Sequence, residues 1–477
     1  MAQAIIGREK EIMRLKAIVE SDKAELVAIY GRRRVGKTFL VKEFFKGKFD
    51  FYATGIFEGK RDDQLAAFCD ALSGNGKKAV PTATTWIQAF ILLRNHLAGI
   101  KKKRIIVFMD ELPWFDTRNS QFLKAFEWFW NSWGSTQHRL KLIVCGSATT
   151  WMTDKFINGK GGLYNRTTER MHLSPFNLHE AALLLKSNGL DWEPNRILDA
   201  YMIFGGMPLY LSMLKRELSL EANVDNLFFG EGAPLTHEYA FLLRSLFNNS
   251  DYYQRILDAI SQKNMGISRQ EIARSAKMSM NGSLTSALNN LISCDFIRRY
   301  SAFGKSERDA LFQLTDLFIL FYKRFVERYN GKDEHHWVNS IDSPARRTWT
   351  GLAFEQVCLL HVAQIKQALG IAGIQTDVCS WRHVGDAHTN GAQIDLLIAR
   401  RDKTINLCEM KYADSPYEIT GKLCNELRER KATFRSITGT RYALHQTMVS
   451  PYGIKPNAHA QIADQVVTLK HLFADKQ

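Results

Sequence analysis

The N-terminal part of the chain alternates between short apolar runs and segments with helical periodicity. Residues 26–30 (LVAIY) and 105–109 (IIVFM) are almost entirely apolar, which is typical of strands buried on both faces of a parallel sheet. Residues 39–45 (FLVKEFF), which follow the first run, have the pattern of a helix. This order predicts an α/β domain built on a parallel sheet.

The middle of the chain is mainly helical in pattern. Between residues 175 and 250, apolar side chains recur at positions i, i+3 and i+4. Residues 252–303 predict three helices and a strand-like end at 296–301, which is the order of a winged helix-turn-helix. The apolar tract 311–321 (LFQLTDLFILF) is too short to cross a membrane, and we expect it to form a buried helix.

The C-terminal part combines one long helix with strands. Polar residues 335–343 indicate a linker, after which an amphipathic helix is expected from Trp349 to Leu369. Residues 391–398 and 405–411 then predict two strands. This pattern indicates a further α/β domain.

Length and composition narrow the possible functions. The 477 residues suggest roughly three domains, and a net charge of +15 favours a polyanionic partner, which on charge alone could be nucleic acid, acidic lipid or acidic protein. Seven cysteines are scattered without a CxxC pair, and the N-terminus carries no apolar run with a small-residue cleavage site. We therefore expect a cytoplasmic protein without disulfides, structural zinc or a membrane segment.

A phosphate-binding loop lies between the first predicted strand and helix. Its pattern, GxxxxGK[ST], comprises Gly31, Arg32, Arg33, Arg34, Val35, Gly36, Lys37 and Thr38. Backbone N–H groups of such a loop surround phosphate oxygens, while Lys37 is expected to reach the β- and γ-phosphates and Thr38 to hold Mg²⁺. ATP and Mg²⁺ are therefore the expected cofactors.

An acidic pair ends the second predicted strand. Asp110 and Glu111 follow residues 105–109, at the edge where a parallel sheet presents its ligand-binding groups. We expect Asp110 to contribute to the metal site and Glu111 to polarise the water that attacks the γ-phosphate.

Several further motifs resemble AAA+ and STAND-type P-loop ATPases. Residues 6–9 (IGRE) are similar to the opening motif that lies near the adenine in these families. The resemblance implies that Ser147 occupies the sensor position near the γ-phosphate. It also implies that Arg166, with Arg170 as second choice, is an arginine finger for a neighbouring subunit, and that Pro208 belongs to a nucleotide-responsive helical lid. The protein would then be a homo-oligomer.

The predicted winged helix is consistent with DNA binding and also with protein contacts. Polar residues mark the expected outer face of its third helix: Ser283, Thr285, Ser286 and Asn289. Seven basic and three acidic side chains in residues 252–303 give a net charge of only +4. Both kinds of partner therefore remain open.

The two C-terminal strands carry residues suited to phosphodiester hydrolysis. Asp395 lies in the first strand, and Glu409 and Lys411 lie in the second, fourteen residues later. Because side chains alternate along a strand, Glu409 and Lys411 share one face, where a carboxylate can hold a metal ion beside a cation.

These features resemble the PD-(D/E)XK, restriction-endonuclease-like fold found in related predicted ATPases of archaea and bacteria. The resemblance implies a metal site formed by Glu355, Asp395 and Glu409, with Lys411 as a catalytic residue. Gln393 departs from the pattern, because those relatives often have Glu at this position.

The fold class expected from these patterns is a multidomain α/β protein. Its expected parts are a P-loop ATPase core (1–174), a helical lid (175–250), a winged helix-turn-helix with connector (251–333) and a nuclease-like domain (345–477). The leading hypothesis is an ATP-hydrolysing protein that acts on DNA. Two alternatives remain: a nucleotide-regulated DNA-binding or signalling switch with an inactive nuclease-like domain, and an ATPase that binds only protein.

Overall fold

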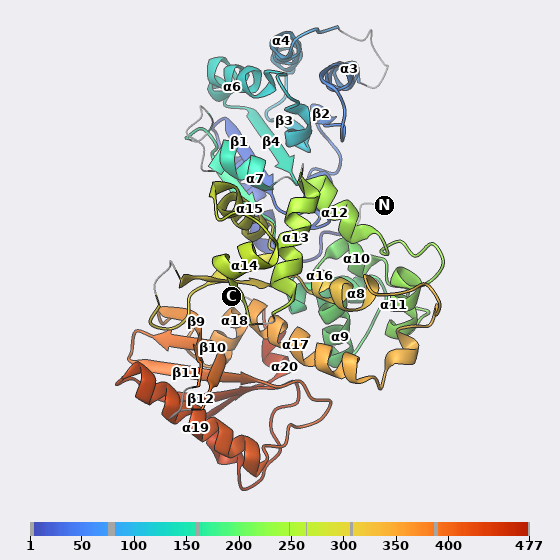
Figure 1. Ribbon diagram of the computed structural model, residues 1–477. Helices are drawn as coiled ribbons and strands as arrows, with labels where there is room; N and C mark the ends of the chain where they lie inside the picture. The colour runs from blue at the N-terminus through green and yellow to red at the C-terminus, as the bar shows by residue number, and fades with distance from the viewer. Residues whose placement is uncertain are drawn as a thin grey trace. The chain divides into compact units, whose positions relative to one another are not determined.

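The computed structural model describes residues 4–74, 82–147, 149–157, 163, 165–247, 249–263, 265–305, 309–385 and 390–475. The chain divides into two compact units (Figure 1). The first comprises Met1–Ser174 with Ser245–Asn248, and the second comprises Pro175–Arg244 with Asn249–Gln477. Within the described residues, no helix is long and apolar enough to span a membrane.

The first unit is built on a five-stranded parallel sheet in the order β2-β3-β4-β1-β5. The strands are β1 (Glu25–Tyr30), β2 (Phe51–Thr54), β3 (Ile105–Asp110), β4 (Leu140–Gly146) and β5 (Glu169–His172). The predicted strands at 26–30 and 105–109 and the parallel sheet are thereby confirmed. Every residue of β3 and β4 is buried, which agrees with the apolar runs 105–109 and 142–145 that these strands contain.

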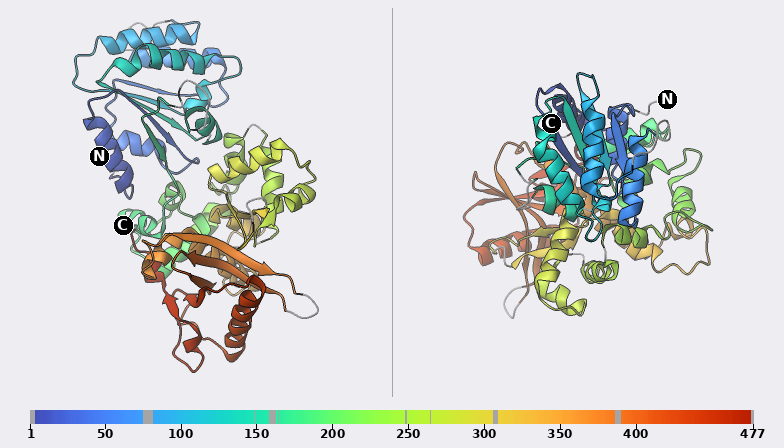
Figure 2. Two further views of the ribbon diagram at one scale, coloured as in Figure 1. Left: turned by 90° about the vertical axis from the view of Figure 1, so that its left-hand side faces the viewer. Right: turned by 90° about the horizontal axis from the view of Figure 1, so that it is seen from above.

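Helices cover this sheet, as the views in Figures 1 and 2 show. The helices of the first unit are α1 (Glu9–Glu20), α2 (Lys37–Phe44), α3 (Arg61–Leu72), α4 (Trp86–Ala98), α5 (Leu112–Phe115), α6 (Phe122–Ser132) and α7 (Thr149–Met152). One large aromatic core joins a face of the sheet to α3, α4 and α6, with Phe68, Phe90 and Phe126 fully buried. This core fixes the strand ends from which the candidate site extends.

The second unit begins with helices and a small antiparallel sheet. The helices are α8 (Leu178–Ser187), α9 (Pro194–Phe204), α10 (Pro208–Ser212), α11 (Leu220–Phe228), α12 (Glu238–Leu246), α13 (Ser250–Ser261), α14 (Arg269–Ser275) and α15 (Gly282–Ser293). The sheet has the order β6-β8-β7, with β6 (Ile267–Ser268), β7 (Ile297–Tyr300) and β8 (Leu311–Leu314). The three predicted helices within residues 252–303 and the strand after them are confirmed.

The prediction of one buried helix over residues 311–321 was wrong. Leu311–Leu314 forms strand β8, which pairs antiparallel with β7, and only Leu317–Phe321 forms a helix, α16. The side chain of Asp316 accepts a hydrogen bond from Ile319 N (2.6 Å) and caps this helix. The capping residue therefore separates a strand from a helix inside one apolar run.

The C-terminal sheet has five strands in the order β13-β12-β11-β10-β9. Its strands are β9 (Thr376–His383), β10 (Ala392–Arg400), β11 (Thr404–Met410), β12 (Ala443–Val449) and β13 (Gln465–Val467), accompanied by α17 (Pro344–Leu360), α18 (Val362–Ala368), α19 (Gly421–Thr438) and α20 (Leu469–Leu472). Strands β9 and β10 are antiparallel to their neighbours, whereas β11, β12 and β13 are mutually parallel. The two predicted strands, β10 and β11, are confirmed.

Two C-terminal predictions need correction. The single helix expected from Trp349 to Leu369 is interrupted at His361, whose Nδ1 lies 2.7 Å from Val357 O and whose Nε2 accepts from Leu178 N (3.0 Å). The expected linker also contains a fully buried residue, Trp337, with Arg346 stacked 4.2 Å from its ring. A side chain packed this firmly makes the segment part of the second unit.

We predict that Gly206→Ala destabilises the second unit. An added Cβ would lie 1.8 Å from the backbone oxygen of Phe176, so the backbone must move, at a cost of about 3 kcal/mol. Gly230→Ala is the matched control, because its Cβ would meet no atom closer than 3.6 Å. Thermal unfolding followed by circular dichroism should show a lower midpoint for Gly206→Ala alone, and equal midpoints would contradict this packing.

Candidate nucleotide site and C-terminal carboxylates

The phosphate-loop motif connects β1 to α2 by a tight turn. Gly31 and Gly36 have φ values of 149° and 91°, a region that favours glycine. An added Cβ on Gly31 would lie 2.3 Å from Leu173 O, so the loop start also requires a residue without a side chain. The buried ammonium of Lys37 donates to the carbonyls of Gly31 (2.9 Å) and Arg32 (3.0 Å). The ammonium group of Lys37 therefore lies inside the loop whose backbone N–H groups are expected to bind phosphate.

The side chains of Thr38 and Asp110 are in contact. Thr38 follows β1 and Asp110 ends β3, and β4 lies between these two strands in the sheet. The Thr38 hydroxyl donates to Asp110 Oδ2 at 2.8 Å. Burial raises the pKa of the Asp110 carboxyl, whereas the hydrogen bond from Thr38 lowers it. A hydroxyl and a carboxylate oxygen at this separation are hard ligands of the kind that Mg²⁺ prefers. The donor set therefore fits the expected metal.

Glu111 is held by the residue predicted to be a sensor. Its backbone is left-handed (φ 46°), and its Oε2 accepts hydrogen bonds from both Ser147 Oγ (2.7 Å) and Ser147 N (3.0 Å). A strained backbone and two donors fix the carboxylate beside Asp110. The arrangement can hold a general base in one orientation.

The sequence did not indicate how residues 6–9 support the loop. Arg8 is buried, and its Nη2 donates to Val35 O (3.2 Å) in the phosphate loop and to Ser174 O (2.8 Å). Arg8 therefore connects the start of the chain to the loop and to the end of the first unit. A lone arginine before a helix gives no sequence signal for such a contact.

Two further residues were predicted to serve the nucleotide site. Arg166 is exposed, and its backbone N–H donates to Leu163 O (3.1 Å). Pro208 is the first residue of α10, in the second unit, where Gly206 O accepts from Phe176 N (2.7 Å). Their roles in nucleotide hydrolysis stay predictions.

The C-terminal candidate site is centred on an irregularity in β10. The pairing of β10 with β9 shifts register between Ile394 and Leu397, so Asp395 lies at a bulge, a feature that re-aims side chains near active sites. Gln393 Nε2 donates to Asp395 Oδ1. The residue that departs from the expected pattern thus contacts the predicted ligand directly.

Glu409 is paired with two cations. Its Oε1 lies 2.9 Å from Lys411 Nζ, as the shared strand face predicted, and its Oε2 is bound by Arg430 of α19. The sequence offered no sign of Arg430, because its contact with Glu409 depends on how α19 packs against the sheet. These pairs neutralise the carboxylate in its buried position.

Glu355 faces this site from α17. Burial, followed by the charges of Asp395 and Glu409, raises the pKa of Glu355 to about 7. Burial likewise raises the pKa of Asp395. Among the described residues, no group of three or more His, Cys, Asp or Glu side chains is arranged to hold a metal ion. The predicted set of Glu355, Asp395 and Glu409 is therefore near one locus but is not a preformed metal cage.

The N-terminal part of the chain is similar to a known family. Residues 5–214 match a family described as an ATPase domain predominantly from Archaea. An uncharacterized protein of Methanocaldococcus jannaschii is 26% identical over 431 residues, which cover 88% of this chain and 90% of the relative. An uncharacterized ATP-binding protein of the same archaeon is 44% identical over 43 residues, which cover 9% of this chain and 73% of the relative.

Solved structures show a more distant similarity. The Walker-type ATPase of Pyrococcus abyssi has a TM-score of 0.47 and 18% identity, covering 66% of this chain and 95% of its own. The ORC2 protein of Aeropyrum pernix, solved as ADPNP–ADP complexes, has a TM-score of 0.44 and 15% identity, covering 68% and 95%.

We predict that Glu111 and Ser147 act together in ATP hydrolysis. Glu111→Gln should bind ATP normally but lose about 10²–10⁴-fold in rate, as expected when a general base is removed. Ser147→Ala removes one of the two donors to Glu111 and should cost about 10- to 100-fold. Calorimetry and phosphate release would measure both. Hydrolysis by Glu111→Gln at the wild-type rate would exclude Glu111 as the base.

We also predict a pH-dependent effect of Glu355→Gln. Because the folded-state pKa is about 7 and the ordinary value is 4.5, the protonated carboxyl stabilises the fold at low pH, and this stability is lost as pH rises through 7. The free energy of unfolding of Glu355→Gln, measured relative to that of wild type, should therefore increase by about 2 kcal/mol between pH 5 and pH 8. Melting in EDTA would test this, with Glu426→Gln, on α19, as the control. A difference that does not change with pH would contradict the prediction.

Proposed function

We propose that this protein hydrolyses ATP with Mg²⁺ and acts on DNA through its C-terminal half. The match of residues 5–214 to a family described as an ATPase domain predominantly from Archaea supports the ATPase part. The observation that carries the ATPase part is the 2.8 Å contact between the Thr38 hydroxyl and the Asp110 carboxylate. This contact joins the phosphate loop to the acidic end of β3, which is what a shared metal site requires.

Each residue of the first site has a distinct proposed role. Thr38 and Asp110 would hold Mg²⁺, which neutralises charge on the phosphates. Lys37 and the backbone N–H groups of the loop bind the phosphate oxygens. Glu111 takes the proton of the attacking water, and Ser147 keeps the Glu111 carboxylate oriented toward it.

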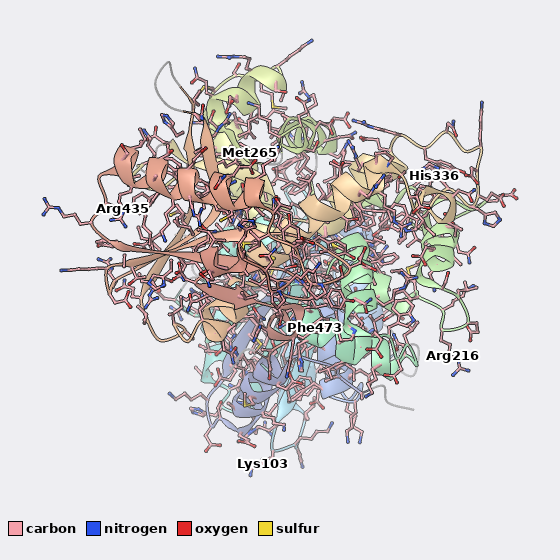
Figure 3. All side chains as sticks on the ribbon, turned by 90° about the horizontal axis from the view of Figure 1, so that it is seen from below. Lys103, Arg216, Met265, His336, Arg435 and Phe473 are labelled. Carbon is pink, nitrogen blue, oxygen red and sulfur yellow. The ribbon has the colours of Figure 1, made fainter. Side chains whose placement is uncertain are left out.

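The proposal of DNA binding rests on the helices and small sheet of the second unit. The order α13, β6, α14, α15, β7, β8 is that of a winged helix-turn-helix. The polar residues on α15 that would read DNA are all exposed: Ser283, Thr285, Ser286 and Asn289. Exposed basic side chains also lie along α19, among them Arg435 (Figure 3). The excess of positive charge supports the same partner.

Two functions on DNA are candidates for the C-terminal domain: cleavage, and binding without cleavage. A mixed sheet with Asp395 and Glu409 on neighbouring strands, and Lys411 beside Glu409, favours metal-dependent phosphodiester hydrolysis. The second candidate is a switch that binds DNA without cutting it. It is favoured by one observation: both oxygens of Glu409 are already bound by Lys411 and Arg430.

One experiment separates these functions. Several DNA forms would be incubated with Mg²⁺ or Mn²⁺, with and without ATP, using wild type, Asp395→Asn and the control Asp377→Asn, an exposed acid on β9. Cleavage lost only in Asp395→Asn supports the nuclease. Salt-sensitive binding without cleavage supports the switch. If DNA is neither bound nor cut, both DNA proposals fail and an ATPase that binds protein remains.

We predict that the ATPase site is completed by a second copy of this chain through Arg166. Lys37→Ala lacks the phosphate contact but keeps Arg166, and Arg166→Ala has the reverse defect. Each variant alone should lose about 10³-fold or more in rate, and mixing them should restore hydrolysis if the arginine acts between subunits. Arg61→Ala, an exposed arginine paired with Asp62, is the control. A mixture as inactive as its components would argue against completion in trans.

A further inference from the structure

The residues that directly follow strand β7 contact the edge of the C-terminal sheet. We call residues 297–303, which comprise β7 and the three residues after it, the wing segment. Ala302 forms a parallel bridge with Ser380 of β9, and Phe303 N donates to Ser380 O at 2.7 Å. Because β9 is the outermost strand of its sheet, the wing segment pairs with an edge that would otherwise be open.

The end of the wing segment is also packed into the C-terminal core. The ring of Phe303 lies 5.2 Å from that of Phe434, which in turn lies 5.1 Å from Trp381. Trp381 and Phe434 belong to the buried cluster beneath the sheet, and Phe303 packs against that cluster. An aromatic anchor and a backbone hydrogen bond therefore hold the wing segment in place.

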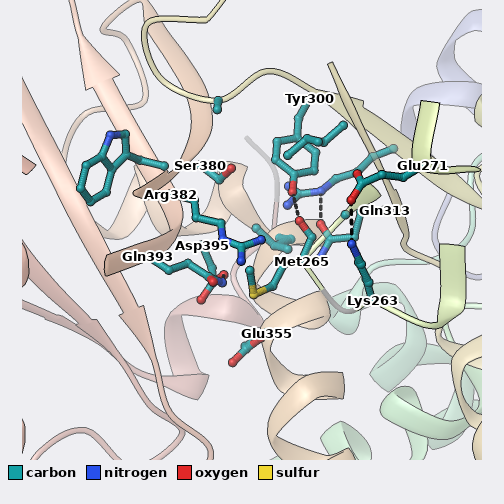
Figure 4. Close-up of a pocket in the computed structure, with 16 residues that line it drawn as sticks. Lys263, Met265, Glu271, Tyr300, Gln313, Glu355, Ser380, Arg382, Gln393 and Asp395 are labelled. Carbon is teal, nitrogen blue, oxygen red and sulfur yellow. Dashed lines mark hydrogen bonds and ion pairs between the residues drawn. The ribbon is translucent and has the colours of Figure 1, made fainter. Parts of the chain in front are cut away.

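A pocket lies between the wing segment and the C-terminal candidate site (Figure 4). On one side it is lined by Arg298 and Tyr300 of β7 and by Gln313 of β8, and on the other by Glu355 and Asp395. Two contacts fix the side chain of Arg298 on the wing side of the pocket. Its Nε donates to Gln313 Oε1 (2.7 Å), and its guanidinium lies 4.4 Å from the centre of the Tyr300 ring. The wing side is thus a rigid wall facing the two carboxyls.

The pocket is too small for a nucleic-acid substrate. Its volume is about 160 Å³, whereas sites for small organic ligands measure about 300–1,000 Å³. A phosphodiester with its flanking sugars therefore does not fit into this pocket while the wing segment is docked.

We propose that the wing segment is a built-in cover of the C-terminal carboxylate site and must leave Ser380 and Phe434 before a DNA strand reaches Glu355 and Asp395. This inference rests on the proposed function of the C-terminal domain.

Chemical labelling of the carboxyls tests the cover without DNA. The full-length protein would be treated with a water-soluble carbodiimide and glycine ethyl ester, and modification of Glu355 and Asp395 would be followed by mass spectrometry. Phe303→Ala removes the anchoring ring and should increase labelling of both residues about tenfold, as the undocked population grows. Tyr452→Ala, which truncates an exposed ring elsewhere in the domain, should leave labelling unchanged.

A variant in which a disulfide holds the wing segment on β9 tests the opposite effect, a decrease in labelling. Ala302→Cys with Ser380→Cys, in a chain carrying Cys379→Ser, joins the bridge partners by a disulfide that dithiothreitol removes. The oxidised form should label more slowly than its reduced form. Equal labelling of the oxidised and reduced forms overturns the cover, as does unchanged labelling in Phe303→Ala when hydrogen exchange shows residues 297–303 released. Increased labelling without any DNA cleavage supports the cover and defeats the nuclease proposal.

Discussion

The contact between the Thr38 hydroxyl and the Asp110 carboxylate requires the whole first unit to be folded. The two residues lie 72 positions apart and follow strands that are not neighbours, because β4 separates β1 from β3. The parallel sheet brings the carboxyl ends of both strands to one edge, and the aromatic core packs against this sheet. Glu111, with its left-handed backbone and the two hydrogen bonds that it accepts from Ser147, lies at the same edge.

In the second unit, the buried carboxylates of the C-terminal domain differ in how their charge is compensated. Glu409 is buried on β11 and is bound by both Lys411 and Arg430, which offsets the loss of hydration. Glu355 is buried beside the carboxyls of Asp395 and Glu409, and burial followed by these charges raises its pKa to about 7. Burial raises the pKa of both Glu355 and Asp395, and these two carboxyls line the pocket that the wing segment borders.

Local patterns predicted much of this structure. Continuous apolar runs identified β1 and β3, and the phosphate-loop motif located the turn between β1 and α2, because these features depend on neighbouring residues. Contacts between distant segments that belong to no known motif could not be predicted. Arg8 reaches Val35, and Arg430 reaches Glu409, through tertiary packing that leaves no mark on spacing. The strand β8 was missed because its apolar run continues into α16, and only the cap at Asp316 divides them.

The most direct test of the central claim replaces the Thr38 side chain while keeping its size. Thr38→Val retains the shape but loses the hydroxyl that contacts Asp110, whereas Thr38→Ser retains the hydroxyl. Mg²⁺-dependent ATP hydrolysis should fall at least ~10-fold in Thr38→Val and stay near the wild-type rate in Thr38→Ser. Wild-type hydrolysis by Thr38→Val, with the same dependence on Mg²⁺, would contradict the account.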